Sequence, residues 1–213
     1  MVRSSPLAFA LAVALAGCAG GSDDESGSDR GKTREAEHGV TARLPAGGHV
    51  PEPRISDLDS AARAAECELR SSGARSRDHT ASLEEPIDYG TNPPTTGRHF
   101  QAAAGDGIYE EAAPDSAIVH SLEHGRVVIW FKPSLPEEAR AGLRALVEQD
   151  GHQILVIPRS EMPFDVAATA WNGSPGPEGI GRLLGCPDFS PAVYDALRTF
   201  RDEHRGRGPE VAP

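Results

Sequence analysis

The stretch His120-Ser-Leu-Glu-His-Gly-Arg-Val-Val-Ile-Trp-Phe131 decides how the rest of the sequence is interpreted. Two histidines and a glutamate fall within five of its residues, and a glycine follows them. The run from Val127 to Phe131 is rich in β-branched and aromatic residues, which predicts a buried strand. A titratable cluster therefore stands at the beginning of the most apolar strand of the chain, where a scaffold can hold a functional site.

A second stretch, Asn92-Pro-Pro-Thr-Thr-Gly-Arg-His99, lies about twenty residues upstream. It belongs to a region, 71–116, that is rich in Gly, Pro, Ser and Thr and is predicted to be mostly loop. A loop of this length in a compact domain is usually functional or disordered. Because Pro93 and Pro94 stiffen the backbone and Gly97 permits a sharp turn, we expect an ordered loop that faces the histidine cluster.

Apolar spacing, capping residues and turn residues predict the remaining elements. The first is a helix that begins near Ser56 and carries Cys67 and Leu69 near its end. The second is a helix that the capping box Ser134 to Glu137 opens and Gly151 stops. Strands at 153–157 and 166–171 follow, and then a last helix that begins at Ser190-Pro191. The segment before Arg126 allows two interpretations. It is either a helix with Asp115 as its cap and Gly125 as its stop, or a strand at 117–119 followed by a turn.

The order strand, helix, strand, strand, helix after residue 126 predicts an α+β fold. We expect a single domain over residues 40–205, in which helices pack on one face of a small mixed sheet and long loops are ordered. A frayed tail is expected at 206–213. The sequence has no internal repeat, no Gly-rich phosphate loop after a strand and no Gly-x-Ser-x-Gly elbow.

Composition excludes one class of partner. The chain has 213 residues, a formal net charge of −11, 23 glycines and 18 prolines. This length suits one domain with appendages. Because phosphate binding needs a basic stripe and this acidic chain has none, we do not expect it to bind nucleic acid. The acidity identifies no protein partner.

The first 17 residues have the shape of a secretory signal, with a basic start at Met1-Val-Arg3 and an apolar run from Leu7. The end of this leader, Leu15-Ala-Gly-Cys18, resembles the bacterial lipobox, in which a peptidase cuts before a diacylated cysteine. We therefore expect an exported lipoprotein that acyl chains such as palmitate on Cys18 anchor to the bacterial cell membrane, with its domain outside the cytoplasm. Residues 18–39 are polar and would form a flexible tether. The alternative is an ordinary signal peptide with a chance cysteine.

Two further cysteines, Cys67 and Cys186, remain once Cys18 carries lipid. In an oxidising compartment we expect them to pair. The bridge would close a loop of 119 residues (186 − 67), for which chain entropy gives a stabilisation of about 4 to 5 kcal/mol before strain. Free thiols or a thiolate metal ligand are the alternatives.

The two polar stretches together resemble a bacterial family of exported proteins known as domain of unknown function 3105. Family members have the patterns Asn-Pro-Pro-Thr-Ser-Gly-x-His, Gly-x-Tyr and His-x-Leu-Glu-His-Gly, which this sequence meets at 92–99, 107–109 and 120–125. Thr96 replaces the usual serine and keeps the hydroxyl, and Ala168-Thr-Ala-Trp171 and Cys186 also resemble the family. The resemblance covers roughly residues 45–205. It implies an exported or membrane-tethered protein and no particular activity.

Four side chains form the candidate site: His99, His120, Glu123 and His124. Imidazoles suit zinc, copper, nickel and iron. On a helical turn His120 and His124 would share one face and reach one ion, whereas on a strand they would stand about 13 Å apart. We expect His99 to be the third ligand, and Glu123 to be a ligand or to support one. Copper is the first choice and zinc the second, with Met162 as a candidate soft ligand that packing alone would also explain.

Three other functions fit these residues. The histidines could form a structural network that bonds backbone carbonyls. His120 to His124 also matches the His-x-x-Glu-His pattern of zinc peptidases, with Glu123 as general base, although that pattern sits on a long helix and needs a further carboxylate such as Glu203. An adhesion module without a ligand is the third. The sequence favours a metal-binding protein over an enzyme, and it predicts surface or loop positions for five histidines: His38, His49, His79, His152 and His204.

The lipobox makes a direct prediction. Cys18→Ser should block lipidation and normal processing, because the thiol that accepts the acyl chains is lost. Mass spectrometry of the mature protein checks this. A wild-type protein that keeps residues before Cys18, or that carries no lipid mass, would contradict the anchor.

Overall fold

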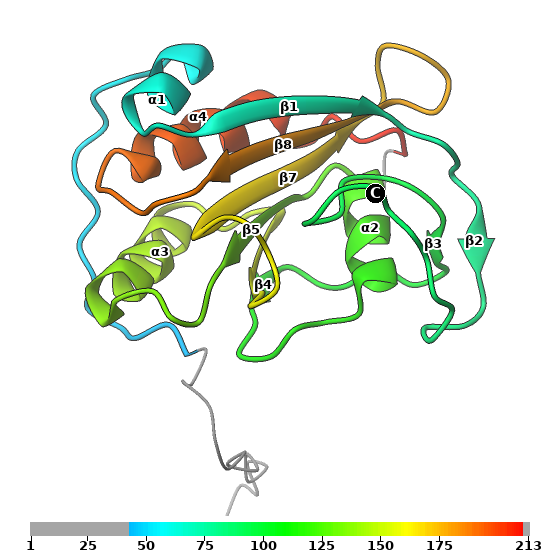
Figure 1. Cartoon of the computed structure of the whole chain (residues 1–213), viewed down its shortest axis with the longest axis horizontal. Helices are drawn as coiled ribbons and strands as arrows, with labels where there is room; N and C mark the ends of the chain where they lie inside the picture. Colours follow the sequence, from blue (N-terminus) through cyan, green and yellow to red (C-terminus); the bar gives the residue numbers. More distant parts are fainter. Residues whose placement is uncertain (1–42, 211–213) are drawn as a thin grey trace, which may run out of the picture. The chain divides into compact units, whose positions relative to one another are not determined.

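The computed structural model describes residues 43–210, which a mixed six-stranded sheet organises (Figure 1). Expectations for the leader at 1–17, the lipid on Cys18 and the tether at 18–39 lie outside the described residues. The elements in chain order are α1 Leu58–Ala64, β1 Glu68–Gly73, β2 His79–Thr80, β3 His99–Phe100, β4 Gly107–Ile108, α2 Asp115–Glu123, β5 Val127–Phe131, α3 Glu137–Gln149, β6 Ile154–Pro158, β7 Val166–Asn172, β8 Ile180–Cys186 and α4 Val193–His204.

Strand β5 lies inside the sheet, whose strand order is β1-β8-β7-β5-β6-β4. It pairs in parallel with β6 and antiparallel with β7, and all its residues are buried, so the strand predicted at 127–131 is confirmed. The pairs β7–β8 and β8–β1 are antiparallel, and β4 adds to β6 in parallel. Strands β2 and β3 form a separate two-stranded parallel sheet.

Alternation along β5 divides the core between the two faces of the sheet. Val127, Ile129 and Phe131 belong to an apolar cluster with residues of α1, α3 and α4. Val128 and Trp130 belong to a second cluster with residues of α2. The α+β class is confirmed, and three of the four helices in the described chain share one face as expected. Helix α2, which carries the histidine cluster, covers the other face.

At the flanks of the sheet one prediction was wrong and one strand was missed. The first helix ends at Ala64, because Glu66 takes a left-handed φ of 55° and turns the chain into β1, where Leu69 is 38 % exposed. Strand β8 was not predicted, because two glycines weaken its strand pattern. The structure explains both glycines: a Cβ at Gly181 would meet Thr95 at 2.4 Å, and one at Gly185 would meet the Phe164 ring at 2.4 Å.

Two helices begin at slightly different residues from those that the capping patterns predicted. The segment before Arg126 is the helix α2, not a strand, and Pro114 rather than Asp115 is its N-cap residue. It ends at Gly125, whose φ of +80° is left-handed, as the glycine predicted. Helix α3 begins at Glu137 with Pro136 as its cap and no side-chain capping bond, so the predicted box with Ser134 does not form. A residue before proline avoids the helical region, which moves the start past Leu135.

The C-terminal segment 206–210 is hydrogen-bonded to the end of α2. Gly206 N–H donates to the Gly125 carbonyl (2.8 Å), and Glu210 N–H donates to the Glu123 carbonyl (3.1 Å). A Cβ at Gly208 would lie 2.1 Å from the Glu123 carbonyl oxygen, so only glycine allows this approach. None of the helices within residues 43–210 is long and apolar enough to cross a membrane.

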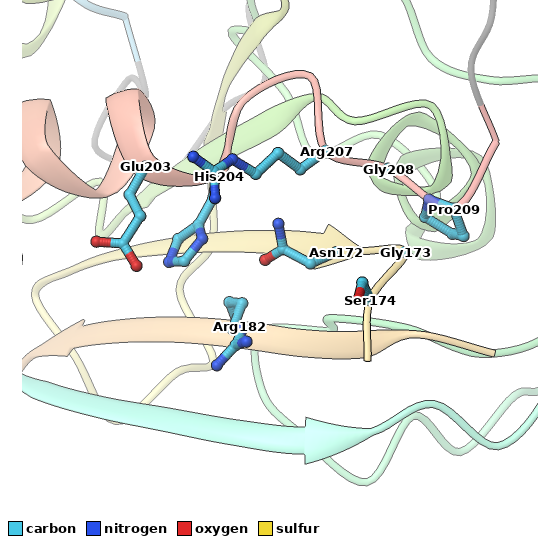
Figure 2. A pocket seen from close by; sticks show the side chains of 9 residues that line it. All are labelled: Asn172, Gly173, Ser174, Arg182, Glu203, His204, Arg207, Gly208 and Pro209. Atoms are coloured by element: carbon cyan, nitrogen blue, oxygen red, sulfur yellow. The ribbon is translucent and has the colours of Figure 1, made fainter. Parts of the chain in front are cut away.

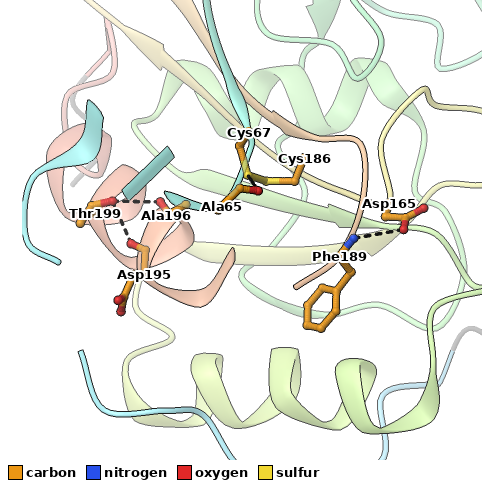
Figure 3. The surroundings of a disulfide bond; sticks show 8 residues. All are labelled: Ala65, Cys67, Asp165, Cys186, Phe189, Asp195, Ala196 and Thr199. Atoms are coloured by element: carbon orange, nitrogen blue, oxygen red, sulfur yellow. Dashed lines mark hydrogen bonds between the residues drawn. A yellow bond between two sulfur atoms is a disulfide. The ribbon is translucent and has the colours of Figure 1, made fainter. Parts of the chain in front are cut away.

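A disulfide joins Cys67 to Cys186, as predicted (Figure 3). It ties the turn after α1 to the end of β8, next to the antiparallel pairing of Glu68 with Gly185. The bridge spans 119 residues, and Cys186 is fully buried in the cluster that α1, α3 and α4 share. It therefore fixes the edge strand β1 on the sheet.

Removing this bridge should lower stability. The double change Cys67→Ser and Cys186→Ser should reduce the free energy of unfolding by about 2 to 5 kcal/mol, because the unfolded chain regains the freedom of a long closed loop. Urea unfolding measures this. Reduction of the wild type should give a similar shift and leave the variant unchanged. Equal stability of variant and wild type would contradict the prediction.

Candidate metal centre

The site begins with two buried histidines on neighbouring elements. His99 on β3 is 0 % exposed, and His120 on α2 is 7 % exposed. The Nδ1 of His99 bonds the Gly97 carbonyl oxygen at 2.7 Å, and the Nδ1 of His120 bonds the Phe100 carbonyl oxygen at 2.7 Å. A carbonyl only accepts, so in both rings Nδ1 carries the proton. The neutral form of each ring therefore has its lone pair on Nε2, which is how metal-binding histidines are commonly oriented.

Glu123, one turn after His120 on α2, brings a carboxylate to the same place. It is 1 % exposed, and the Arg77 Nε–H donates to its Oε1 at 2.7 Å. Its Oε2 lies 2.9 Å from the Nε2 of His99 yet makes no hydrogen bond within the described residues. Burial alone would raise the pKa of Glu123, but His99 and Arg77 outweigh burial and lower it to about 2. The side chain is thus a carboxylate with one oxygen oriented by arginine and the other beside the His99 ring, where either an imidazolium or a metal ion would neutralise it.

His79 completes the cluster, and no pattern in the sequence indicates this role. Parallel pairing of β2 with β3 sets His79 directly beside His99, with 3.2 Å between their Nε2 atoms. Its Nε2 is 3.8 Å from Glu123 Oε2, and its side chain is 42 % exposed. The two histidines are twenty residues apart in the chain, and no local spacing rule relates such positions. His79 provides the solvent-facing side of the site.

Four potential ligand atoms therefore converge. One atom each from His79, His99, His120 and Glu123 lies within 4.8 Å of the others. Ligand atoms around a tetrahedral zinc ion, at about 2.0 to 2.1 Å from it, are roughly 3.3 to 3.4 Å apart. The separations among the ligand atoms of His79, His99 and Glu123, which are 2.9, 3.2 and 3.8 Å, are close to that value. The arrangement can thus hold one metal ion with three imidazoles and one carboxylate.

The structure separates the other two proposed ligands from this group. His124 is the C-cap residue of α2, and its ring stacks on that of His120, with centroids 4.6 Å apart. Because it stands outside the four-residue cluster, it contacts a ligand ring instead of adding an atom to the group. Met162 is 6 % exposed and belongs to the apolar cluster of Trp130 and Phe164, so packing explains it.

The predicted loop at 92–99 is ordered and holds His99. Thr95 and Thr96 are buried, and the close approach of Thr95 to Gly181 sets the loop on the sheet face that α2 covers. Arg159 donates to Asn92 Oδ1 (2.6 Å) and to both carboxylate oxygens of Asp115 at the start of α2 (2.7 and 3.0 Å). One arginine therefore ties the loop to the helix, which fixes both buried histidines relative to each other.

Trp171 forms an apolar wall of the site. Its ring meets that of His99 edge-on, with centroids 5.8 Å apart and planes at 86°. Its Nε1–H donates to the Glu178 carbonyl oxygen (2.8 Å), which holds the indole in place. The Ala168-to-Trp171 segment noted in the sequence is therefore part of β7 behind the cluster.

Among the remaining histidines, His204 was placed wrongly. It is 6 % exposed at the end of α4 and lies against the Phe200 ring, with centroids 4.5 Å apart. Burial, helped by the charges of Arg182 and Arg207, lowers the pKa of His204 to about 4. His49 and His152 are exposed as predicted, and His38 lies outside the described residues.

Comparison with known proteins gives the family. The family described as "Protein of unknown function (DUF3105)" matches residues 80–212 of the chain. The chain belongs to this family, and the resemblance noted from its two motifs is confirmed. No curated protein and no solved structure matched it. His79 lies one residue before the matched range, whereas His99, its partner in the β2–β3 pairing, lies within it.

The pKa of Glu123 makes a testable prediction. Its carboxylate contributes stability that is complete above its ordinary pKa of about 4.5 and is lost as the pH falls toward 2, up to roughly 3 kcal/mol. Glu123→Gln should therefore unfold with a free energy that depends less on pH between about 5 and 3 than that of the wild type. Urea unfolding of metal-free protein measures this. Glu203→Gln, at an exposed carboxylate, is the control and should keep the wild-type slope.

Proposed function

We propose that the domain binds one divalent transition-metal ion through His79, His99, His120 and Glu123. The observation that carries this proposal is the convergence of four ligand atoms from β2, β3 and α2 within 4.8 Å of one another. Glu123 Oε2 is buried without a hydrogen bond, and such an atom costs free energy unless a cation meets it. A metal ion would satisfy this oxygen and the Nε2 lone pairs together.

The donor set favours zinc(II) or copper(II). Nitrogen and carboxylate ligands suit both ions, whereas copper(I) prefers thiolate and thioether sulfur. The cysteines of the described chain form a disulfide, and Met162 packs in the core. Because His79 is 42 % exposed, an ion can enter and leave on its side, which suits reversible binding.

The same geometry favours binding over hydrolysis. In a His-x-x-Glu-His peptidase the glutamate acts as general base beside the ion. Here Glu123 faces the cluster with one oxygen and Arg77 with the other, and a pKa of about 2 makes it a weak base at neutral pH. His124, which the peptidase pattern needs as a ligand, stands outside the cluster.

A structural network is the second candidate, and one contact favours it. The 2.9 Å approach of His99 Nε2 to Glu123 Oε2 would also suit a buried imidazolium paired with the carboxylate. That arrangement needs no metal, and in it the histidines would contribute only to the stability of the fold. The two candidates therefore differ in what added metal does to the wild type.

The cellular setting is part of the proposal. The leader and the Leu15-Ala-Gly-Cys18 lipobox support an exported protein anchored to the bacterial cell membrane by lipid on Cys18. The Cys67–Cys186 disulfide supports an oxidising compartment. In this setting the metal centre would lie outside the cytoplasm.

Calorimetric titration with zinc and copper(II) should show one site per chain. His99→Ala and His120→Ala should each weaken binding at least roughly a hundredfold, because each removes an oriented ligand. A saturating ion at about 100 times its dissociation constant should stabilise the wild type by about 2.7 kcal/mol. Affinity should fall as the solution is made acidic, since protons compete with the ion for the ligand nitrogens.

Matched histidine variants serve as controls. His49→Ala and His152→Ala, at exposed positions outside the cluster, should bind as the wild type does. His124→Ala should weaken binding less than His99→Ala. If metal fails to raise the melting temperature of the wild type while His99→Ala lowers it in metal-free buffer, the histidines form a structural network and the metal proposal is wrong.

A further inference from the structure

A second site lies away from the metal cluster. A cavity of about 540 Å³ opens between the ends of β7 and β8 and the C-terminal segment after α4 (Figure 2). Its volume falls in the range of small-molecule sites, and none of the metal-cluster residues lines it. Four side chains face it that the metal centre does not use: Asn172, Arg182, His204 and Arg207.

Several polar groups in this cavity have no partner within residues 43–210. Asn172, the last residue of β7, is 6 % exposed, and its Oδ1 makes no hydrogen bond. Arg182 donates from Nη1 to Ser71 Oγ (2.8 Å), yet its buried Nε–H makes no bond. Arg207 is exposed, and its guanidinium makes no ion pair or hydrogen bond within the same residues, so it is free to meet an anion at the mouth of the cavity. Buried donors and acceptors are nearly always paired, so Asn172 Oδ1 and Arg182 Nε point to a ligand.

The charges in the cavity define the kind of ligand. Arg182 and Arg207 carry two positive charges, and the exposed Glu203 at the rim carries one negative charge. His204 is neutral at pH 7, because burial and the two arginines lower its pKa to about 4. The net charge of +1 matches a monoanion, and Glu203 would repel a dianion. Guanidinium groups bind carboxylates well.

We propose that this cavity binds a small carboxylate that carries a hydroxyl or amino group on the adjacent carbon. The carboxylate would accept from Arg182 and Arg207. The hydroxyl or amino group would donate to Asn172 Oδ1, and an ammonium would also be attracted to Glu203. Each unpaired group of the cavity then has a partner of the required chemistry.

The C-terminal segment forms one wall of this site. Gly173 N–H donates to the Arg207 carbonyl oxygen (2.8 Å), which fixes the segment against the end of β7. A Cβ at Gly173 would meet Pro209 at 2.8 Å. The backbone alone therefore holds the Arg207 side chain at the cavity, and replacing that side chain should not release the segment.

Calorimetric titration of the full chain with glycolate, glycine, acetate and inorganic phosphate tests the proposal. The protein is first freed of metal on a chelating resin, so that the result does not depend on the histidine site. Glycolate or glycine should bind saturably and at least about tenfold more tightly than acetate, which lacks the second group. Arg207→Gln should weaken that binding at least about tenfold and keep the wild-type melting temperature.

Two further variants complete the test. Asn172→Ala should remove the preference for glycolate over acetate. Arg63→Gln, at an exposed arginine of α1 that does not line the cavity, should bind as the wild type does. The proposal is overturned if neither glycolate nor glycine gives saturable binding, if Arg207→Gln binds as tightly as the wild type, or if phosphate binds more tightly than both.

Discussion

The buried carboxylate of Glu123 is the constraint on which the arrangement around it depends. A charge that is 1 % exposed is costly unless cations or donors meet it. Arg77 supplies one partner from the loop between β1 and β2, and His99 and His79 stand at the other oxygen. These partners come from segments that share no local structure with α2. The interactions that neutralise the Glu123 carboxylate therefore hold three parts of the chain together: the β2–β3 pair, the loop between β1 and β2, and helix α2.

The end of α2 is held from its other side by glycine contacts. Gly125 takes the left-handed conformation that ends the helix, and a Cβ there would lie 2.9 Å from the Gly208 nitrogen. The C-terminal segment bonds the carbonyls of Glu123 and Gly125 along this approach. The same segment passes the cavity at Asn172 and Arg207. The two proposed sites thus share one structural element while using different side chains.

The sheet explains why the polar site lies where it does. Strand β5 sends alternate residues to two faces, and Val127, Ile129 and Phe131 pack with apolar residues of α1, α3 and α4 on one of them. The other face, covered by α2 and the loop at 92–99, has the apolar residues Trp130 and Trp171 beside polar ones. Trp130 Nε1–H donates to Thr169 Oγ1 (2.8 Å), and Trp171 lies against His99. A rigid sheet face that is largely buried from solvent can hold histidine rings in fixed orientations.

The sequence by itself determined the α+β class, the strand at 127–131, the family, the cysteine pair and three residues of the cluster, His99, His120 and Glu123. These follow from short patterns, because helical spacing, strand composition and stiff turns act over a few residues. Tertiary structure alone decided that His79 joins the cluster, that His124 stacks behind His120, and that Arg77 pairs with Glu123. Each of these depends on strand pairing or on the end of a helix against a distant segment. Such contacts are set by packing between parts of the chain that no local spacing connects.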